Sequence, residues 1–182
     1  MLKAIIAADK NSGIGNKGAL PWKCPEDMKY FKNTTTGHVV VMGNTTWKSL
    51  NCSPLPNRLN IVLASEFNEH LHEKADFVVT PTDVYNVAGI DVNIQFVDNP
   101  VSTILNAVGY FDEIYLQDVF IIGGSKIYAQ FLPDVEELHM STISGEHECD
   151  TFFNPFQYND HLDIASMTFG DNLLVSIYRK SV

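Results

Sequence analysis

The chain has 182 residues, of which 45% are hydrophobic and 19% charged, and its 22 acidic side chains outnumber the 12 basic ones to give a net charge of −10. This composition is typical of one globular domain with a buried core, and it argues against a disordered chain, a nucleic-acid-binding protein and a protein of anionic membrane surfaces. No apolar run approaches the about 18 residues of a membrane span, and three cysteines without CxxC spacing favour a reducing cytoplasm over a disulfide framework.

Short apolar runs alternate with helical patterns, which is typical of a three-layer α/β domain with a mostly parallel, buried central sheet. The predicted strands of this part are Ala4–Ala8, His38–Met42, Asn60–Ala64, Phe77–Thr80, Val92–Val97 and Val119–Ile122. The four helices predicted to flank the sheet are Pro25–Asn33, Thr45–Leu50, Pro100–Gly109 and Lys126–Leu132.

The pattern changes after Pro133. Three further strands are predicted at Glu137–Ile143, Leu162–Phe169 and Leu173–Arg179. Gly-Asp-Asn between the last two is typical of a hairpin turn, so we expect the C-terminal end of the sheet to be antiparallel. No repeat, low-complexity segment or linker interrupts the chain, which predicts a single domain over residues 1–182.

The segment Gly13–Gly18 matches the dinucleotide fingerprint G-x-G-x-x-G letter for letter. That fingerprint requires a helix to begin at the glycines, directly after a strand. Here Ala19-Leu20-Pro21-Trp22 follows, and no helix can begin before about Pro25. We therefore reject the Rossmann interpretation; a mobile lid beside a site and a plain surface loop both remain open.

Two other glycine positions have the context that a phosphate site requires. Gly43 lies between a predicted strand and the helix-opening residues that start at Asn44, and Gly123-Gly124 lies between another strand and Ser125. Helix N-termini present unpaired N–H groups, and a missing Cβ lets a phosphate approach the backbone. Each turn alone is more typical of ordinary strand-to-helix connections. Together, at the carboxyl ends of parallel strands, they predict a ligand with several phosphates.

Asp27 lies in the first turn of a predicted helix, on the same face as Phe31 and next to Met28. Acidic residues favour the first helical turn because of the helix dipole, so a purely structural role remains open. A carboxylate beside an apolar wall is partly desolvated, which suits it to bind or protonate a nitrogen heterocycle.

Arg58 follows Pro54-Leu55-Pro56-Asn57, whose prolines stiffen the chain. A rigid arginine suits bidentate recognition of a carboxylate, although a solvated arginine at a strand edge fits equally well. The histidines at 70 and 72 and the cluster His147-Glu148-Cys149-Asp150 lack metal-ligand spacing, so no metal site is expected.

Taken in order, these motifs resemble those of the dihydrofolate reductases. The matching residues are Ile14-Gly15, Leu20-Pro21-Trp22, Pro25, Asp27, Phe31, Val41-Met42-Gly43, Thr45, Thr46, Trp47, Leu55-Pro56-Asn57-Arg58, Gly123-Gly124, Tyr128 and Asp150-Thr151-Phe152. The resemblance covers the chain except about residues 66–96, and it implies a dihydrofolate reductase-like fold. It also implies reduction of 7,8-dihydrofolate to tetrahydrofolate by NADPH, which supplies one-carbon and thymidylate metabolism.

The resemblance implies a role for each matching residue of the substrate site. Asp27 would hold the pterin's 2-amino group and N3 and support protonation at N5, with Trp22 ordering a water beside it. Ser141 would hydrogen-bond Asp27, Tyr128 would lie near the junction of nicotinamide and pterin, and Arg58 would clamp the glutamate α-carboxylate. The remaining implied substrate contacts are Ile5, Met28, Phe31, Leu50, Leu55 and Ile122.

For the cofactor, the resemblance implies that the two glycine turns cradle the phosphates of NADPH. The implied contacts are Ala7, Ile14, Gly15, Leu20, Gly43, Asn44, Thr45, Thr46, Leu63, Ala64, Ser65, Gly123, Gly124, Ser125, Lys126 and Ile127. Asn44 departs from the family, in which this position is often basic and contacts the 2′-phosphate, and Ala64 lacks a hydroxyl that many members carry. Lys126 and Ser65 would have to compensate if NADPH is preferred over NADH.

Segment 66–118 is about 25 residues longer than in compact family members, so we expect a family-atypical insertion at about 66–96. Two other functions are weighed against the reductase: the pyrimidine reductase of riboflavin synthesis, and a catalytically inactive nucleotide-binding module. The pyrimidine reductase would not need Asp27 with Phe31 or the arginine clamp at Arg58, and the presence of Asp27, Trp22 and Arg58 together argues against an inactive module. The expected protein is a cytoplasmic monomer whose partner is dihydrofolate, with no nucleic acid and no membrane.

Overall fold

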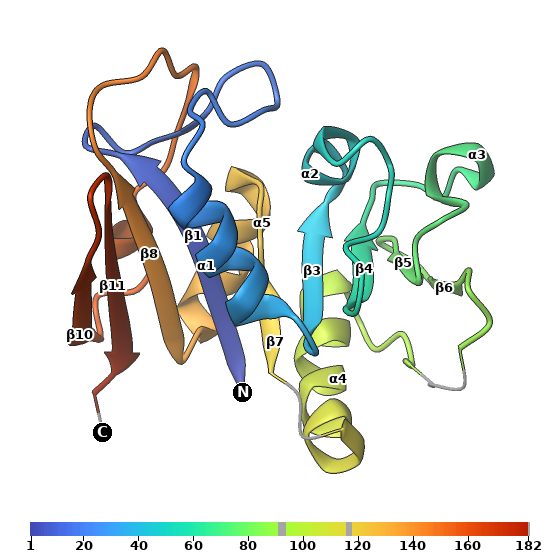
Figure 1. Cartoon of the computed structure of the whole chain (residues 1–182). Coiled ribbons are helices and arrows are strands. Elements are labelled where there is room, and N and C mark those ends of the chain that lie inside the picture. Colours follow the sequence, from blue (N-terminus) through green and yellow to red (C-terminus); the bar gives the residue numbers. More distant parts are fainter. Residues whose placement is uncertain (91–93, 116–117, 182) are drawn as a thin grey trace.

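The computed structural model describes residues 1–90, 94–115 and 118–181. Within them, nine strands form one sheet in the order β10-β11-β8-β1-β7-β3-β4-β5-β6, and β2 pairs with β9 in a small separate ladder (Figure 1). The strands are β1 (Leu2–Asp9), β2 (Gly13–Gly15), β3 (Val39–Gly43), β4 (Leu59–Leu63), β5 (Phe77–Val79), β6 (Val84–Asn86), β7 (Val119–Ile121), β8 (Glu137–Ile143), β9 (Thr151–Phe152), β10 (Leu162–Phe169) and β11 (Leu173–Lys180). The helices are α1 (Pro25–Thr35), α2 (Asn44–Ser49), α3 (Glu69–His72), α4 (Pro100–Tyr115) and α5 (Ser125–Phe131), with 3-10 turns η1 (Leu132–Asp134) and η2 (Pro155–Gln157).

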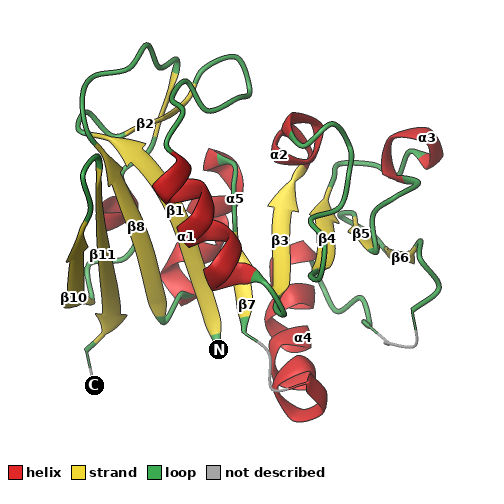
Figure 2. Ribbon diagram, in the orientation of Figure 1, coloured by secondary structure: helices red, strands yellow, loops and turns green. Residues whose placement is uncertain are grey.

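The predicted mostly parallel α/β architecture is confirmed. Neighbouring strands from β8 through β1, β7, β3 and β4 to β5 all run parallel. The antiparallel pairs lie at the two ends of the sheet, with β6 on β5 at one end and the β10–β11 hairpin on β8 at the other (Figure 2). The predicted strand at 137–143 therefore joins both regions, because it is parallel to β1 and antiparallel to β11.

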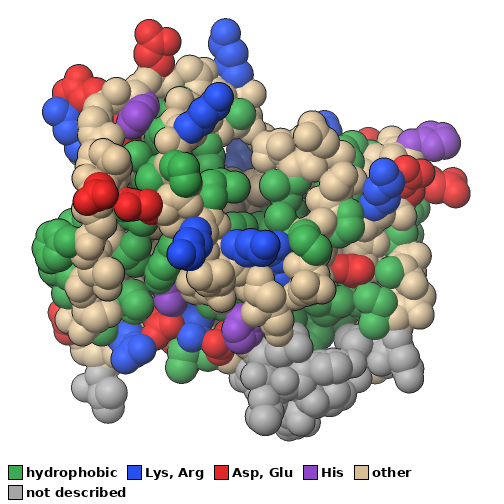
Figure 3. Space-filling view, viewed as in Figure 1, with side chains coloured by type: hydrophobic (Ala, Val, Ile, Leu, Met, Phe, Trp, Pro, Cys, Tyr) green, Lys and Arg blue, Asp and Glu red, His purple; other side chains and the backbone are tan. Residues whose placement is uncertain are grey.

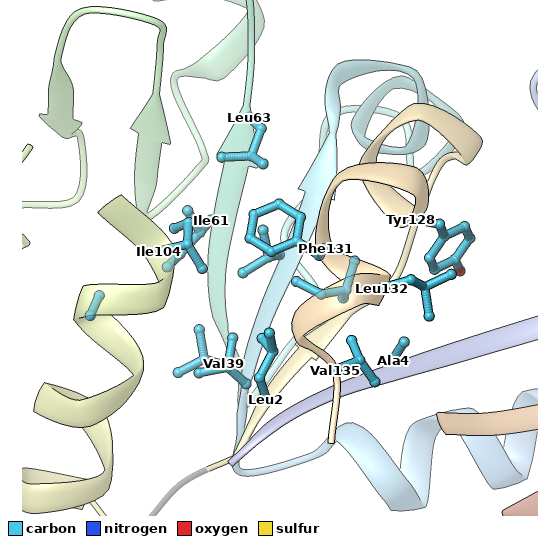
Figure 4. Close-up of a cluster of buried hydrophobic side chains, with 14 of the residues drawn as sticks. Leu2, Ala4, Val39, Ile61, Leu63, Ile104, Tyr128, Phe131, Leu132 and Val135 are labelled. Atoms are coloured by element: carbon cyan, nitrogen blue, oxygen red, sulfur yellow. The ribbon is translucent and has the colours of Figure 1, made fainter. Parts of the chain in front are cut away.

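One face of the sheet packs against α4 and α5. Side chains of a strand alternate between faces, and Leu2, Ala4 and Ile6 of β1 all point to this face. Figure 4 shows Ile104 of α4 beside Ile61 of β4, within the same buried cluster. Leu132 and Val135, which follow α5 in the chain, complete this buried cluster.

The opposite face packs against α1 and α2. The alternate residues of the strands, such as Val40, Met42 and Val62, meet Trp47 of α2 and the partly buried Phe31 of α1. Trp47 is completely buried. Because both faces are covered, the central strands are apolar without interruption, as the sequence pattern indicated.

The predicted strand at 92–97 is wrong for the part of that range that the structure describes. Positions 92 and 93 lie outside the described residues, and 94–97 are not in a strand. The second strand of this region is instead β6, which follows β5 through a tight turn in which the Thr80 N–H donates to the Asp83 carbonyl oxygen over 2.9 Å. Ile94 still reaches the core, where it is 7% exposed. An apolar run predicts that a segment is buried, but it does not show that the segment pairs with a strand of the sheet.

A buried polar network ties α1 to the sheet. Tyr30 of α1 donates its hydroxyl to His139 Nδ1 over 2.5 Å, and His139 Nε2 donates to Glu137 over 2.8 Å. Glu137 also accepts from Lys3 over 2.9 Å and from Arg179 over 2.6 Å. Burial alone would raise the pKa of Glu137, but these hydrogen bonds outweigh it and lower the pKa to about 2.

We expect Glu137→Gln to lower the free energy of unfolding at pH 7 by about 2 kcal/mol, because it removes charge-assisted hydrogen bonds from a buried site. The pKa of Glu137 is lower in the folded chain, so its stabilisation is present above the unfolded value of 4.5 and is lost as pH falls toward about 2. Urea unfolding at pH 7 and pH 3 should therefore show a smaller difference between variant and wild type at pH 3. As a control, Glu146→Gln, which breaks the exposed pair with Lys10, should cost less than about 0.5 kcal/mol. An equal cost for both variants would contradict the buried-network explanation.

Candidate active site

A hollow lies on one face of the molecule. Figure 3 shows this hollow, lined by hydrophobic side chains, between the part that contains α1 and the part that contains α2. The parallel strands β3, β4 and β7 end on the same side of it, as the pairing of Gly43 with Leu63 and of Val41 with Ile121 requires. Open α/β sheets bind ligands at the carboxyl ends of their strands.

Asp27 is a buried carboxylate at the start of α1. Its residue is only 5% exposed, and it takes part in no ion pair between described residues. Burial raises the pKa of Asp27, and the hydroxyl of Ser141 on β8, which lies near the carboxyl group without completing a hydrogen bond of normal geometry, offsets only part of that rise. The protonated form is therefore more accessible near neutral pH than for an ordinary aspartate.

Two buried polar atoms in this region have no hydrogen-bond partner among the described residues. They are Trp22 Nε1, just before α1, and Ser141 Oγ. Trp22 packs with Cys24 and the partly buried Tyr30 in a small cluster beside the start of α1. Buried polar groups are nearly always hydrogen-bonded, so these two atoms are candidates to bind a polar ligand or water.

Tyr128 of α5 is buried and reaches across to β1. Its hydroxyl donates to the backbone carbonyl of Ile5 over 2.8 Å. Burial, with the nearby charge of Asp27, raises the pKa of Tyr128 far above its usual value, so the phenol stays protonated. It therefore holds the Ile5 carbonyl in place and does not act as an acid or base near neutral pH.

The two glycine turns lie against each other. The Gly43 N–H donates to the Gly123 carbonyl over 2.8 Å, and the Gly123-Gly124 peptide bond is cis. A Cβ on Gly43 would come within 2.7 Å of Ile127 Cγ1, and Gly123 has a φ of +121°, which L side chains rarely adopt. α2 begins at the residue after Gly43 and α5 at the residue after Gly124, so both helix N-termini open on the same space.

Arg58 is held against α1 as its stiff sequence setting suggested. Its guanidinium donates to Thr35 Oγ1 over 2.9 Å and to the Pro56 carbonyl over 3.2 Å, and it lies 5.8 Å from the centre of the Phe31 ring. Burial lowers the pKa of Arg58. The side chain is half-buried, and nothing among the described residues pairs it with a carboxylate.

Sequence reasoning missed the residue that shapes this loop. Asn60 is 1% exposed, accepts from the Leu55 N–H over 2.8 Å and donates to the carbonyls of Leu55 and Arg58. Asp76 in turn accepts from the Asn60 N–H over 2.6 Å. A single Asn inside an apolar strand pattern was the available signal, because such a residue must find partners when it is buried.

The segment predicted as a loop at 13–18 is partly a strand. Gly13 and Gly15 pair with β9, and Gly13 N–H donates to the buried Asp9 carboxylate over 2.9 Å. No helix begins at these glycines, as expected from the rejected dinucleotide fingerprint. No group of three or more His, Cys, Asp or Glu side chains in the described ranges is arranged to hold a metal ion.

The structure groups the predicted cofactor residues around the two glycine turns and the end of β4. Those at or directly after these strand ends are Gly43, Asn44, Thr45, Thr46, Leu63, Ala64, Ser65, Gly123, Gly124, Ser125, Lys126 and Ile127. Ile14 and Gly15 lie on β2, Ala7 lies on β1, and Leu20 is 46% exposed in the segment before α1.

Most of the predicted substrate residues lie in or against the apolar cluster on the α1 face of the sheet. Phe31, Leu50, Leu55 and Ile122 are partly buried around the same apolar cluster, which also contains Ile5. Met28 is 58% exposed on α1.

Comparison with known proteins agrees with this geometry. The family model described as dihydrofolate reductase matches residues 1–172. The dihydrofolate reductase of Staphylococcus aureus strain Mu50 is 32% identical over 169 residues, which is 93% of this chain and 87% of that protein. The bifunctional dihydrofolate reductase-thymidylate synthase of Daucus carota is 32% identical over 82% of this chain and 27% of its own length.

A solved structure shares the fold. The dihydrofolate reductase of Enterococcus faecalis, complexed with NADP(H) and RAB-propyl, superposes with a TM-score of 0.73 at 26% identity, covering 100% of this chain and 97% of that one. The chain belongs to the dihydrofolate reductase family. It is an enzyme that reduces dihydrofolate with NADPH, and the resemblance found in the sequence is confirmed.

The contact between the glycine turns yields a test. Gly43→Ala should weaken NADPH binding about tenfold and destabilise the fold by about 1–3 kcal/mol, because the new Cβ collides with Ile127 and forces the turns apart. Quenching of tryptophan fluorescence by NADPH and urea unfolding measure the two effects. Gly109→Ala in α4, where a Cβ meets nothing within 4 Å, should leave binding unchanged and stabilise slightly.

A second variant isolates the collision. Because Ile127→Ala removes the atom that a Cβ at position 43 would meet, adding it to Gly43→Ala should recover part of the lost NADPH affinity. Normal NADPH binding by Gly43→Ala alone would show that the close approach of the two turns is not needed.

Proposed function

We propose that Asp27 is the residue of this dihydrofolate reductase that binds the pterin and supplies the proton to its N5. The observation that carries the proposal is a buried carboxylate with the Ser141 hydroxyl beside it and Trp22 shortly before it in the chain; among the described residues the carboxylate has no ion-pair partner, and Trp22 Nε1 and Ser141 Oγ have no hydrogen-bond partner. A ligand with N–H donors stabilises a carboxylate in this setting, because hydrogen bonds from the pterin's 2-amino group and N3 would replace the hydration that the carboxylate loses on burial.

The raised pKa of Asp27 suits the second half of this role. Because burial disfavours the ionised form of Asp27, a larger fraction of its carboxyl group is protonated near neutral pH, so a proton is available there for a weakly basic ring nitrogen. Trp22 Nε1 and Ser141 Oγ would hold a water and the carboxyl group in line with the ring nitrogen. The Ile5 carbonyl, fixed by the phenol of Tyr128, would accept a further hydrogen bond from the pterin.

The residues around the glycine turns fit NADPH. A Cβ at Gly43 or Gly123 would fill the space where the two turns meet, and both helices present unpaired N–H groups there. Thr45, Thr46 and Ser125–Ile127 would contact the cofactor phosphates, and Leu63 would pack on the adenine. When bound, NADPH supplies the hydride that the pterin receives at C6. The protein's own part is to hold both partners and to exclude water.

The tail of the substrate would lie along α1. Phe31, Leu50 and Leu55 form its apolar wall, and Arg58 would bind the α-carboxylate of the glutamate. The hydrogen bonds from Arg58 to Thr35 and Pro56 support this assignment, since they fix a guanidinium that still has donors to spare.

We also infer a cytoplasmic monomer that forms one domain over residues 1–182, with no nucleic-acid partner. The net charge of −10 and three free cysteines support the inference. Among the described residues, no helix is long and apolar enough to cross a membrane. An atypical insertion at about 66–96 stays part of this proposal. The family match disfavours the riboflavin-pathway reductase and the inactive nucleotide-binding module.

Asp27→Asn should reduce dihydrofolate turnover at pH 7 by about 100-fold or more, because it removes the proton source, while NADPH binding persists. It should not destabilise the fold: the pKa of Asp27 is raised by burial, so its ionisation costs stability at pH 7 and an amide avoids that cost. Loss of NADPH absorbance and urea unfolding provide the two measurements. Glu26→Gln, on the exposed side of the same helical turn, serves as the matched control. Full turnover by Asp27→Asn would sink the assignment.

Arg58→Leu should raise the Kd for dihydrofolate by about 100-fold but change the Kd of a dihydropterin without the glutamate tail by less than about twofold. Arg58→Lys should fall between the two, because lysine keeps the charge but not the forked geometry. Titration with both ligands measures the difference. Equal losses for the two ligands would rule out the carboxylate clamp.

A further inference from the structure

The segment from Phe67 to Val87 packs against α2, which begins directly after the glycine turn at Gly43 (Figure 1). Trp47 of α2 donates its indole N–H to the Leu71 carbonyl over 2.8 Å. The rings of Phe67 and Tyr85 stack with centroids 4.4 Å apart, and Phe67 also stacks on His72 at 5.9 Å. The segment therefore forms a wall that packs against α2.

His72 is the innermost residue of this wall, with none of its surface exposed. Its Nδ1 receives the backbone N–H of Asn68 over 3.1 Å, and its Nε2 lies 2.9 Å from Asn44 Oδ1. A backbone amide can only donate, so Nδ1 must be the unprotonated nitrogen and Nε2 must carry the proton. The proton on Nε2 is then donated to the Asn44 oxygen.

This chain of donors and acceptors decides which way the Asn44 amide points. An asparagine side chain has nearly the same shape when it is flipped, so packing alone does not distinguish its oxygen from its nitrogen. Here the oxygen is bound to His72, and the NH2 group, which has no partner among the described residues, can donate on the other side. Asn44 is the half-buried first residue of α2, directly after Gly43.

We propose that His72 is a positioning residue for the cofactor: it fixes the Asn44 amide so that its NH2 group, and not its oxygen, meets a phosphate of NADPH. The proposal rests on the cofactor site proposed above, and it gives segment 67–87 a role in cofactor binding. Asn44 lies where Gly43 opens α2, and an amide oxygen turned toward a phosphate there would repel it. Burial lowers the pKa of His72, which keeps the ring neutral and the tautomer unique.

The test compares binding of NADPH and NADH, by quenching of tryptophan fluorescence, to the wild type and to His72→Leu, Asn44→Ala and the double variant. We expect each single change to raise the Kd for NADPH by about 5- to 20-fold, as loss of a hydrogen bond to a charged group predicts, and His72→Leu to leave kcat at saturating NADPH nearly unchanged. If His72 acts through Asn44, the double variant binds no more weakly than Asn44→Ala alone. Additive losses would overturn the proposal.

Further variants separate positioning from general packing. His72→Gln, which can still donate to the Asn44 oxygen, should recover part of the affinity, whereas His70→Leu on the exposed side of α3 should change nothing. A loss confined to NADPH would assign the contact to the 2′-phosphate, and an equal loss for NADH to the diphosphate; both support the proposal.

A direct measurement covers the case in which His72→Leu does not fold. In the wild-type protein, nitrogen-15 NMR of the imidazole should show a protonated Nε2 and a bare Nδ1. The opposite tautomer would overturn the proposal. Failure of the proposed function is distinguishable, because it would appear as a wild type that binds no NADPH, whereas failure here leaves wild-type binding intact and the Asn44 and His72 variants equal to it.

Discussion

The parallel pairing of β3 with β7 is the interaction on which the candidate site depends. It brings Gly43 and Gly123 into hydrogen-bond contact at one edge of the sheet, so that α2 and α5 start side by side. Helix N-termini are partly positive, so the two that begin here support the phosphate site proposed above. The two apolar clusters hold this register, because a slip by one residue would turn every core side chain to the wrong face.

The protein treats its buried carboxylates in opposite ways. Glu137 is surrounded by Lys3, Arg179 and His139, which lower its pKa to about 2 and make it a structural anchor. Asp27 is also buried, and the nearby Ser141 hydroxyl offsets only part of its desolvation, so its pKa is raised. An uncompensated buried carboxylate costs stability. A ligand that donates hydrogen bonds would compensate this cost, and Trp22 Nε1 and Ser141 Oγ, which have no partner among the described residues, support the same proposal.

Helix α1 carries Asp27 and is fixed at several points by residues far away in the sequence. Tyr30, one turn after Asp27, is bound to His139 of β8, and Thr35 at the end of the helix accepts from Arg58. The role proposed for Asp27 requires a carboxylate held to within a fraction of an ångström, and these contacts supply that restraint without neutralising the charge. The wall formed by Phe67–Val87 restrains α2 in a comparable way through Trp47 and Asn44.

The sequence by itself determined the α/β class, eight of the eleven strands and four of the five helices among the described residues, and the candidates Asp27, Arg58 and the two glycine turns, because apolar periodicity and glycine positions are local signals. It did not determine the strand after β5, since the apolar run that contains Ile94 predicts burial but not which segment pairs with β5. Only the tertiary structure decided that Asn60 shapes the loop of Arg58 and that His72 orients Asn44. Those are single polar side chains whose partners lie elsewhere in the chain, and their roles follow from which donors burial brings within reach.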